Sequence, residues 1–278
     1  MERIEGTVTT AISYARVMEE TAREQIRRMC SYELTEGSRV RIMPDVHAGK
    51  GCTIGTTMTI VDKAVPNVVG VDIGCGMYTI DLGRQPIDFF RLDKAAHRVP
   101  SGANVWDEPQ LSFDVHPLYC YDRLKNLSRI ACSIGTLGGG NHFIEVDETH
   151  DGRHYLIIHT GSRNLGKQVA DIYQQIAIEL QGQEETQSEQ INRIIREYQM
   201  AGRQEEIEKS VKEIKRRYHQ KQIPDDLCYV SGKSLKQYLH DVVLCQQFAR
   251  LNREYIARVL LEQTGLKAGE AFHTIHNY

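Results

Sequence analysis

Short apolar segments and long helical patterns occupy different parts of this 278-residue chain, which limits the folds it can adopt. Runs of β-branched residues bounded by Gly and Pro predict short strands at 40–42, 57–61, 68–71, 143–146 and 155–159. From about residue 168 to residue 262, apolar residues recur every three or four positions, which is typical of helices. Because strands and helices do not alternate regularly, we predict an α+β fold with an irregular mixed β-sheet core and surrounding helices.

The helical stretch contains two amphipathic stripes whose other faces are charged. Apolar residues at helical spacing occupy 191–198 and again 207–218, with Glu, Lys and Arg around them. This pattern predicts a charged helical hairpin, most simply a solvated one, with a partner-facing arm as the alternative. Another amphipathic helix is expected near residues 18–29.

The composition narrows the class of protein. Hydrophobic residues make up 41% and charged residues 26%, which is ordinary for a globular chain, and the net charge of −3 excludes a globally basic coat for nucleic acid. A local basic groove stays open. Without an uninterrupted apolar run of about 18 residues, no membrane-spanning helix is expected. Seven scattered cysteines without a secretory signal predict reduced thiols and a cytoplasmic location.

Four glycine-rich segments carry side chains that can do chemistry at the ends of predicted strands. They are MPDVHAGKG with Asp45, VGVDIGCGM with Asp72 and Cys75, GGGNHFIE with Asn141, His142 and Glu145, and LIIHTGSRNLG with His159 and Arg163. Glycine lets a backbone turn tightly and approach a ligand closely. None of the segments has the spacing of a P-loop, a dinucleotide turn or a nucleophile elbow.

Carboxylate, thiol and imidazole groups together suggest a metal centre. Taken alone, Cys75 is better explained as a small buried residue, Asp72 as a turn residue and a single histidine as part of a core. Together with His142, His159 and His276, these residues form a donor set suited to a transition metal. Ligand softness favours zinc, but the sequence does not decide which metal binds.

Read in order, these segments resemble the RtcB family of RNA ligases. The resemblance extends from about residue 40 to the end, and it includes the segment YLHDVVLCQQFARLNRE and the closing HNY. It implies joining of an RNA 3′-phosphate or 2′,3′-cyclic phosphate end to a 5′-hydroxyl end. The family uses GTP and Mn²⁺, through histidine–GMP and RNA-ppG intermediates. An activating partner, archease, is also possible.

The resemblance implies a role for each candidate residue. Two Mn²⁺ ions would be held by Asp72, Cys75, His142, His159 and His276, with Cys75 as the bridge. Guanylate contacts would come from Asn141, His142, Phe143, Ile144, Glu145, His276 and Asn277. Phe143 would stack on the base, and Glu145 would accept hydrogen bonds from the guanine edge. Arg163 would bind an RNA phosphate, and Asp45 would position the 5′-hydroxyl as a catalytic residue.

One departure from the family pattern affects what we expect. Family members are longer, and their nucleophilic histidine lies in the part that follows the position of His276. We therefore expect residues 1–278 to be a single RtcB-like catalytic domain, incomplete at its C-terminus and inactive in guanylyl transfer, with 168–262 as its helical portion. The alternatives are a dinuclear metallophosphoesterase acting on RNA ends and a non-catalytic module that binds RNA ends.

Overall fold

The computed structural model describes residues 1–182, 187–221 and 223–277. The chain divides into two compact units, each assembled from two separate stretches of sequence. The first unit contains Met1–Val68 and Gln174–Gly232, and the second contains Val69–Tyr173 and Lys233–Tyr278. That the whole chain folds as a single domain stays a prediction.

The first unit contains a small sheet of four strands. Their order in the sheet follows the chain: β1 (Glu2–Glu5), β2 (Thr10–Ser13), β3 (Val40–His47) and β4 (Ile54–Met58). Neighbouring strands are antiparallel except β2 and β3, which run parallel. A separate two-stranded ladder joins β5 (Lys63–Ala64) to β9 (Val230–Ser231).

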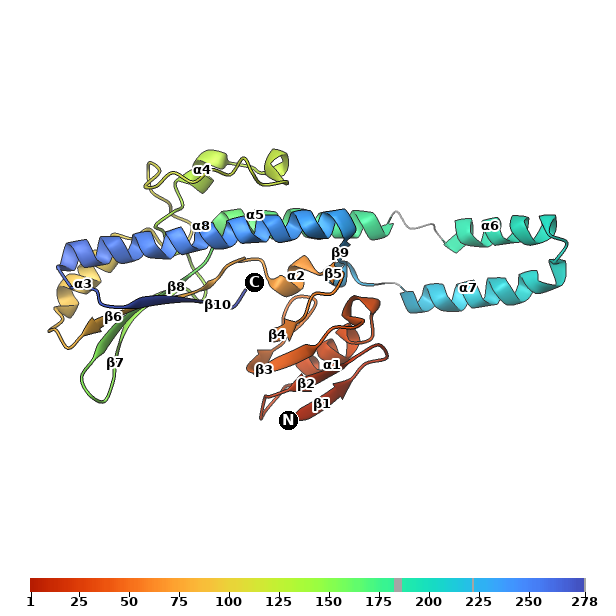
Figure 1. Ribbon diagram of the computed structural model, residues 1–278, viewed down its shortest axis with the longest axis horizontal. Coiled ribbons are helices and arrows are strands. Elements are labelled where there is room, and N and C mark those ends of the chain that lie inside the picture. The colour runs from red at the N-terminus through yellow and green to blue at the C-terminus, as the bar shows by residue number, and fades with distance from the viewer. Residues whose placement is uncertain (183–186, 222, 278) are drawn as a thin grey trace. The chain divides into compact units, whose positions relative to one another are not determined.

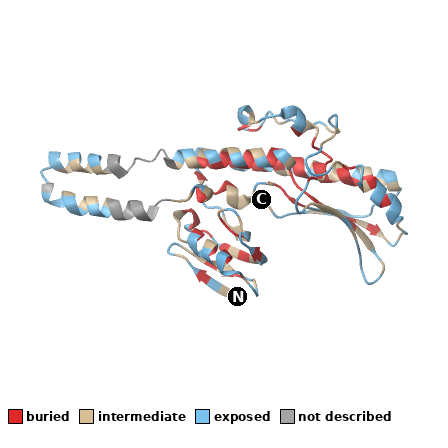
Figure 2. Cartoon of the chain, turned by 180° about the vertical axis from the view of Figure 1, so that it is seen from behind, coloured by how far each residue is buried: buried red, intermediate tan, exposed pale blue. Residues whose placement is uncertain are grey.

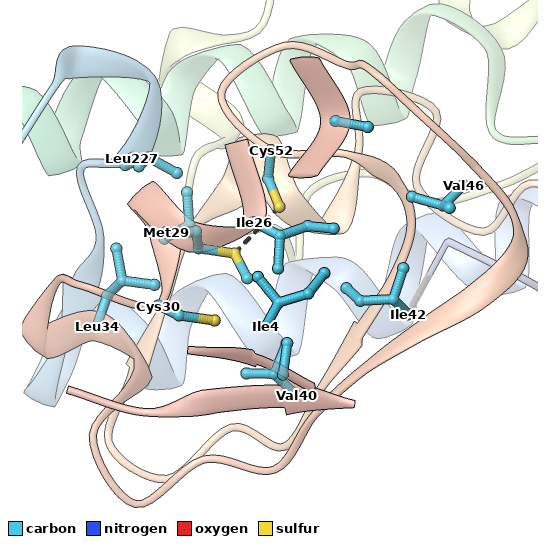
Figure 3. Close-up of a cluster of buried hydrophobic side chains, with 13 residues drawn as sticks. Ile4, Ile26, Met29, Cys30, Leu34, Val40, Ile42, Val46, Cys52 and Leu227 are labelled. Atoms are coloured by element: carbon cyan, nitrogen blue, oxygen red, sulfur yellow. Dashed lines mark hydrogen bonds between the residues drawn. The ribbon is translucent and has the colours of Figure 1, made fainter. Parts of the chain in front are cut away.

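Helix α1 (Glu20–Met29) supplies much of the core of this unit. The predicted apolar stripe is confirmed, because Ala22, Ile26 and Met29 are all fully buried. Figure 3 shows Ile26 and Met29 pointing toward side chains of the sheet, with the Cys52 thiol directed at the Met29 sulfur. Alternation of buried residues along β3 completes the same cluster.

Two strand predictions in this region need correction. The prediction of a strand at 68–71 is wrong, because helix α2 (Pro66–Val69) occupies the start of this segment. The proline ring restricts φ to the helical range, and the N–H that proline lacks is not needed in the first turn of a helix. Pro66 therefore favours a helix that starts here. The strand predicted at 57–61 is β4, which begins earlier and ends at Met58.

Most described residues between 168 and 262 lie in long helices, interrupted by the short strand β9. The helices are α5 (Arg163–Gly182), α6 (Gln187–Met200), α7 (Ile207–Lys221) and α8 (Gly232–Thr264). Helices α6 and α7 contact each other as a hairpin, and their charged faces carry i,i+4 ion pairs such as Arg193–Glu197 and Lys212–Glu208. No described helix is both long and apolar enough to cross a membrane.

The second unit is built around an antiparallel sheet whose order is not sequential. Its strands lie in the order β10 (Ala271–Ile275), β6 (Gly76–Gly83), β8 (His154–Thr160) and β7 (Phe143–Glu148). Helices α8 and α3 (Phe89–Ala96) pack on one face, where Ile80, Leu156 and Ile158 meet Ile256. Figure 1 shows α8 along the strands, and Figure 2 shows buried residues concentrated in the helices α5 and α8, which overlap in that view. The predicted α+β class is confirmed.

Candidate metal centre

The register of the sheet places a histidine and an aromatic ring side by side on its open face. Met77 of β6 lies opposite His159 of β8, which in turn lies opposite Phe143 of β7. Successive residues of a strand point to opposite faces, and Leu156 and Ile158 face the core under α8. His159 and Phe143 therefore lie on the face away from that core, with ring centroids 5.0 Å apart.

All five predicted metal ligands converge at one end of this face. They form two overlapping groups: Asp72, Cys75 and His142 in one, and Cys75, His159 and His276 in the other. Within each group the donor atoms lie within 4.8 Å of one another. The donors come from the loop before β6, the start of β7, the end of β8 and the segment after β10. Cys75 belongs to both groups.

The distances between donor atoms fit ligands that surround a cation. Cys75 Sγ lies 3.5 Å from His142 Nε2 and 3.4 Å from His159 Nε2. The Nε2 atoms of His159 and His276 are 3.1 Å apart. Two ligands bonded to one tetrahedral ion at about 2.0–2.3 Å lie roughly 3.3–3.8 Å apart. A cation with bonds of this length could therefore be bound after only small movements of these side chains.

Backbone carbonyls orient the rings of His142 and His159. His142 Nδ1 lies 2.9 Å from the carbonyl oxygen of Leu137, and His159 Nδ1 lies 3.0 Å from that of Asn141. A carbonyl oxygen can only accept a hydrogen bond, so Nδ1 of His159 carries the proton and its Nε2 has a lone pair. Nε2 of His142 faces an acceptor as well, because it lies 2.9 Å from Oδ2 of Asp72. Metal-binding histidines are commonly oriented in this way.

Asp72 has a carboxylate oxygen without a partner in the described part of the chain and Cys75 a thiol that burial keeps protonated, as expected of metal ligands when no cation is bound. Oδ2 of Asp72 lies 2.9 Å from His142 Nε2, while Oδ1 is buried and has no hydrogen-bond partner among the described residues. Burial, followed by the nearby Asp72 charge, raises the pKa of the Cys75 thiol to about 12. Burial also lowers the pKa of His159, which favours the neutral imidazole that ligates metals. A cation would satisfy the orphaned oxygen and ionise the thiol.

The segment after β10 is tied to the loop that carries Asp72 and Cys75. The backbone N–H of His276 donates to the carbonyl of Cys75 at 3.0 Å, and that of Gly74 donates to the carbonyl of Asn277 at 2.8 Å. The Asn277 amide also donates to the Asp72 carbonyl. These bonds hold His276 beside the other donors, although its side chain is exposed.

The predicted guanylate-binding residues divide between the two faces of β7. Phe143 and Glu145 lie on the open face, and Glu145 is exposed. Ile144 points the other way and packs against the hydrophobic cluster under α8. Asn141 precedes the strand with an exposed side chain, and its carbonyl is already used by His159.

Arg163 is held beside the glycine loop by neutral partners. Its Nε donates to Thr136 Oγ1 at 3.1 Å and its Nη2 to the Gly102 carbonyl at 3.0 Å. Its guanidinium occupies the space that a Cβ on Gly138 would need. No described carboxylate forms an ion pair with it, although the nearby Asp72 charge attracts it, so the guanidinium can still pair with an anion. Asp45 belongs to the first unit, where it is exposed on β3.

Sequence reasoning missed two consecutive residues of α8. Asn252 and Arg253 are fully buried, and both hydrogen-bond to the loops that carry the donors. A signal was present, because Asn252 lies on the apolar stripe of Cys245, Ala249 and Ile256. A polar residue on a buried helical stripe needs partners, which points to a role in organising neighbouring backbone.

Comparison with known proteins agrees with this geometry. The family model described as tRNA-splicing ligase RtcB matches residues 25–113 and 121–277. Similar proteins include the RNA-splicing ligase RtcB of Escherichia coli K12, 30% identical over 162 residues that cover 50% of this chain and 40% of that protein. Others are the RNA-splicing ligase RtcB of Mycobacterium bovis (32%, covering 46% of this chain and 43% of that protein) and the tRNA-splicing ligase RtcB of Aeropyrum pernix (29%, covering 48% and 39%).

The matched region is a part of those relatives. The chain spans about 40% of the length of the Escherichia coli protein and similar shares of the other two. The family match, in contrast, includes most of this chain and contains every residue of the two donor groups. The chain therefore belongs to the RtcB family of tRNA-splicing ligases.

Proposed function

We propose that this chain supplies the metal- and guanylate-binding part of an RNA ligase. The whole protein would join RNA ends that bear a 3′-phosphate or 2′,3′-cyclic phosphate to ends that bear a 5′-hydroxyl. It would use GTP through histidine–GMP and RNA-ppG intermediates. Archease is a candidate activating partner, and seven free cysteines support a cytoplasmic location.

The observation that carries this proposal is the pair of donor groups that share Cys75. A thiolate has enough lone pairs to bind two cations, and a pair of cations stabilises both attacking and leaving oxygens in phosphoryl transfer. The buried, unpartnered Oδ1 of Asp72 supports a cation at this place, since an orphaned carboxylate oxygen is otherwise costly. We propose two Mn²⁺ ions as the occupants.

The remaining residues would bind and orient the other groups. Phe143, beside His159 on the open sheet face, would stack on guanine, and Glu145 two residues later would accept from its N–H edge. Asn141, His276 and Asn277 would also contact the guanylate. Hydrogen bonds to neutral groups fix the guanidinium of Arg163 in place, and no described carboxylate forms an ion pair with it, which suits binding of an RNA phosphate. Asp45 would position the 5′-hydroxyl.

Binding measurements on the chain test this proposal. Equilibrium dialysis against Mn²⁺ is expected to give two ions per chain. With Mn²⁺ present, calorimetric titration is expected to show tighter binding of GTP than of ATP. An RNA oligonucleotide ending in a 3′-phosphate should also bind more tightly than the same RNA ending in a 3′-hydroxyl.

The outcomes separate the proposed function from its alternatives. Two ions without nucleotide preference, together with hydrolysis of a 2′,3′-cyclic phosphate, would favour a metallophosphoesterase. RNA binding that persists unchanged after treatment with a chelator would favour a non-catalytic RNA-end-binding module. Fewer than one ion per chain would contradict the metal centre itself.

A further inference from the structure

Two consecutive residues of α8, Asn252 and Arg253, contact the backbone on either side of the donor groups. Both side chains are fully buried, which is unusual for an amide and rarer for a guanidinium. Burial of such groups is costly unless they are hydrogen-bonded, so their partners indicate what the burial achieves.

Arg253 links the loop of one donor to the strand of another. Its Nη1 donates to the carbonyl of Gly74 at 2.8 Å and to that of Thr160 at 2.7 Å. Gly74 immediately precedes Cys75, and Thr160 immediately follows His159. One nitrogen atom therefore fixes the separation between the backbones of two residues whose side-chain donors are 3.4 Å apart.

Asn252 extends the same arrangement to the loop that leads to His142. Its Oδ1 accepts from the backbone N–H groups of Gly135 at 2.7 Å and Thr136 at 3.0 Å. Its Nδ2 donates to the carbonyls of Thr136 and Gly161, each at 3.1 Å. Both the amide oxygen and the amide nitrogen of Asn252 are thus used on backbone groups near the donors.

A second layer of side chains supports Arg253 from β10. Its Nε lies 3.4 Å from Nδ1 of His273, whose ring stacks on Tyr78 at a centroid distance of 4.1 Å. The other ring nitrogen of His273 lies 3.3 Å from a carboxylate oxygen of Glu254. Arg253 forms no ion pair with a described carboxylate, and its Nη2 is buried without a hydrogen-bond partner among the described residues. Its positive charge lies close enough to the donor groups to be attracted by Asp72 and Cys75.

We propose that Asn252 and Arg253 are positioning residues that hold the backbones of the donor loops at the separation needed for two cations to share Cys75. This inference rests on the proposed metal centre and assigns a role to residues that do not ligate. Small errors in ligand placement weaken metal binding because the bonds are short and directional. Loss of Arg253 would release two carbonyls at once.

Cobalt provides a spectroscopic probe of this role. Co²⁺ bound to a thiolate gives a charge-transfer band in the near ultraviolet, which reports the Cys75–metal bond directly. We expect the wild-type chain to develop the band, and Arg253→Met to bind Co²⁺ about tenfold more weakly with a reduced band. Arg253→Lys should recover most of the affinity, because an ammonium can donate to the same two carbonyls.

A matched control comes from the same helix. Arg258 is exposed and its guanidinium lies over the ring of Tyr255, so Arg258→Met removes a guanidinium from α8 without touching the donor loops or the side chains that support Arg253. Its band should equal that of the wild type. Circular dichroism establishes that each variant is folded. Should Arg253→Met not fold, Asn252→Asp decides, because it keeps the acceptor for Gly135 and Thr136 but replaces the donor to Gly161.

The results have distinct meanings. A folded Arg253→Met or Asn252→Asp chain with wild-type affinity and band would overturn the positioning role. The role would also be overturned if Arg253→Lys bound no better than a folded Arg253→Met. A wild-type chain that binds Co²⁺ without a thiolate band would instead overturn the proposed metal centre, and this inference with it.

Discussion

A methyl group added at Gly161 tests whether Asp72 is a metal ligand. A Cβ at this position would lie 2.5 Å from Cγ, Oδ1 and Oδ2 of the Asp72 carboxylate. Gly161 does not have a positive φ, so alanine introduces no backbone strain and the clash is the main effect. To reach ordinary contact at about 3.4 Å, the carboxylate must move by about 0.9 Å.

This displacement sets the expected magnitude. Metal–carboxylate bonds of roughly 2.0–2.2 Å do not survive such a shift unless the ion follows the ligand. We expect Gly161→Ala to weaken Mn²⁺ binding by about 10- to 100-fold, as changes next to ligands commonly do. That is about 1.4–2.8 kcal/mol at 1.4 kcal/mol per tenfold change. The hydrogen bond between Asp72 and His142 would also be lost, for about 1 kcal/mol of stability.

Calorimetric titration with Mn²⁺ measures the affinity, and scanning calorimetry measures the stability. Gly139→Ala is the matched control, since its Cβ would meet nothing closer than Gly102 Cα at 3.5 Å and its φ is also not positive. The control should bind Mn²⁺ as the wild type does. A folded Gly161→Ala chain with unchanged affinity would refute the view that Asp72 binds the ion from its present position.

Three further predictions concern thiol ligation, base recognition and packing. Cys75→Ser should reduce the Mn²⁺ stoichiometry measured by dialysis, because a hydroxyl cannot replace a bridging thiolate. The control Cys132→Ser should leave the stoichiometry unchanged, and equal stoichiometry in both variants would show that Cys75 is not a ligand. Glu145→Ala should reduce the difference in binding free energy between GTP and ATP by roughly 1–3 kcal/mol in competition titrations. Asp147 is exposed on the same strand face, and Asp147→Ala should leave this difference unchanged. A larger effect of Asp147→Ala than of Glu145→Ala would contradict the guanine-reading role. Ile26→Ala should lower the unfolding free energy by about 2–5 kcal/mol in urea titrations because Ile26 is fully buried, and a loss below 1 kcal/mol would contradict the packing shown in Figure 3.

Local sequence was sufficient to predict a helix or strand where its conformation depends mainly on its own residues. The stripe of Ala22, Ile26 and Met29 is helical and buried, because a 3.6-residue period suits only one secondary structure. The strands predicted at 143–146 and 155–159 from their apolar, β-branched residues are β7 and β8, each of which is two residues longer. The segment 68–71 failed because a short apolar run fits a strand or a helical turn equally well, and Pro66 favoured the helix.

The donor residues themselves could be named from the sequence, since carboxylate, thiol and imidazole groups in glycine-rich turns have few structural uses. Their convergence could not be derived from spacing, because Asp72 and His276 are separated by most of the second unit. Only the strand order β10-β6-β8-β7 brings the end of β8 and the segment after β10 to the loop before β6. Non-local pairing of this kind depends on the whole sheet and leaves little trace in local sequence.

The sequence alone determined the residue types at the centre, the positions of the amphipathic helices and the strands β7 and β8, because these depend on neighbours along the chain. Tertiary structure alone decided which nitrogen of His159 carries a proton, which oxygen of Asp72 is left without a partner among the described residues and which backbone groups Asn252 and Arg253 hold. The physical reason is that hydrogen-bond satisfaction in a buried site is a property of all surrounding elements together.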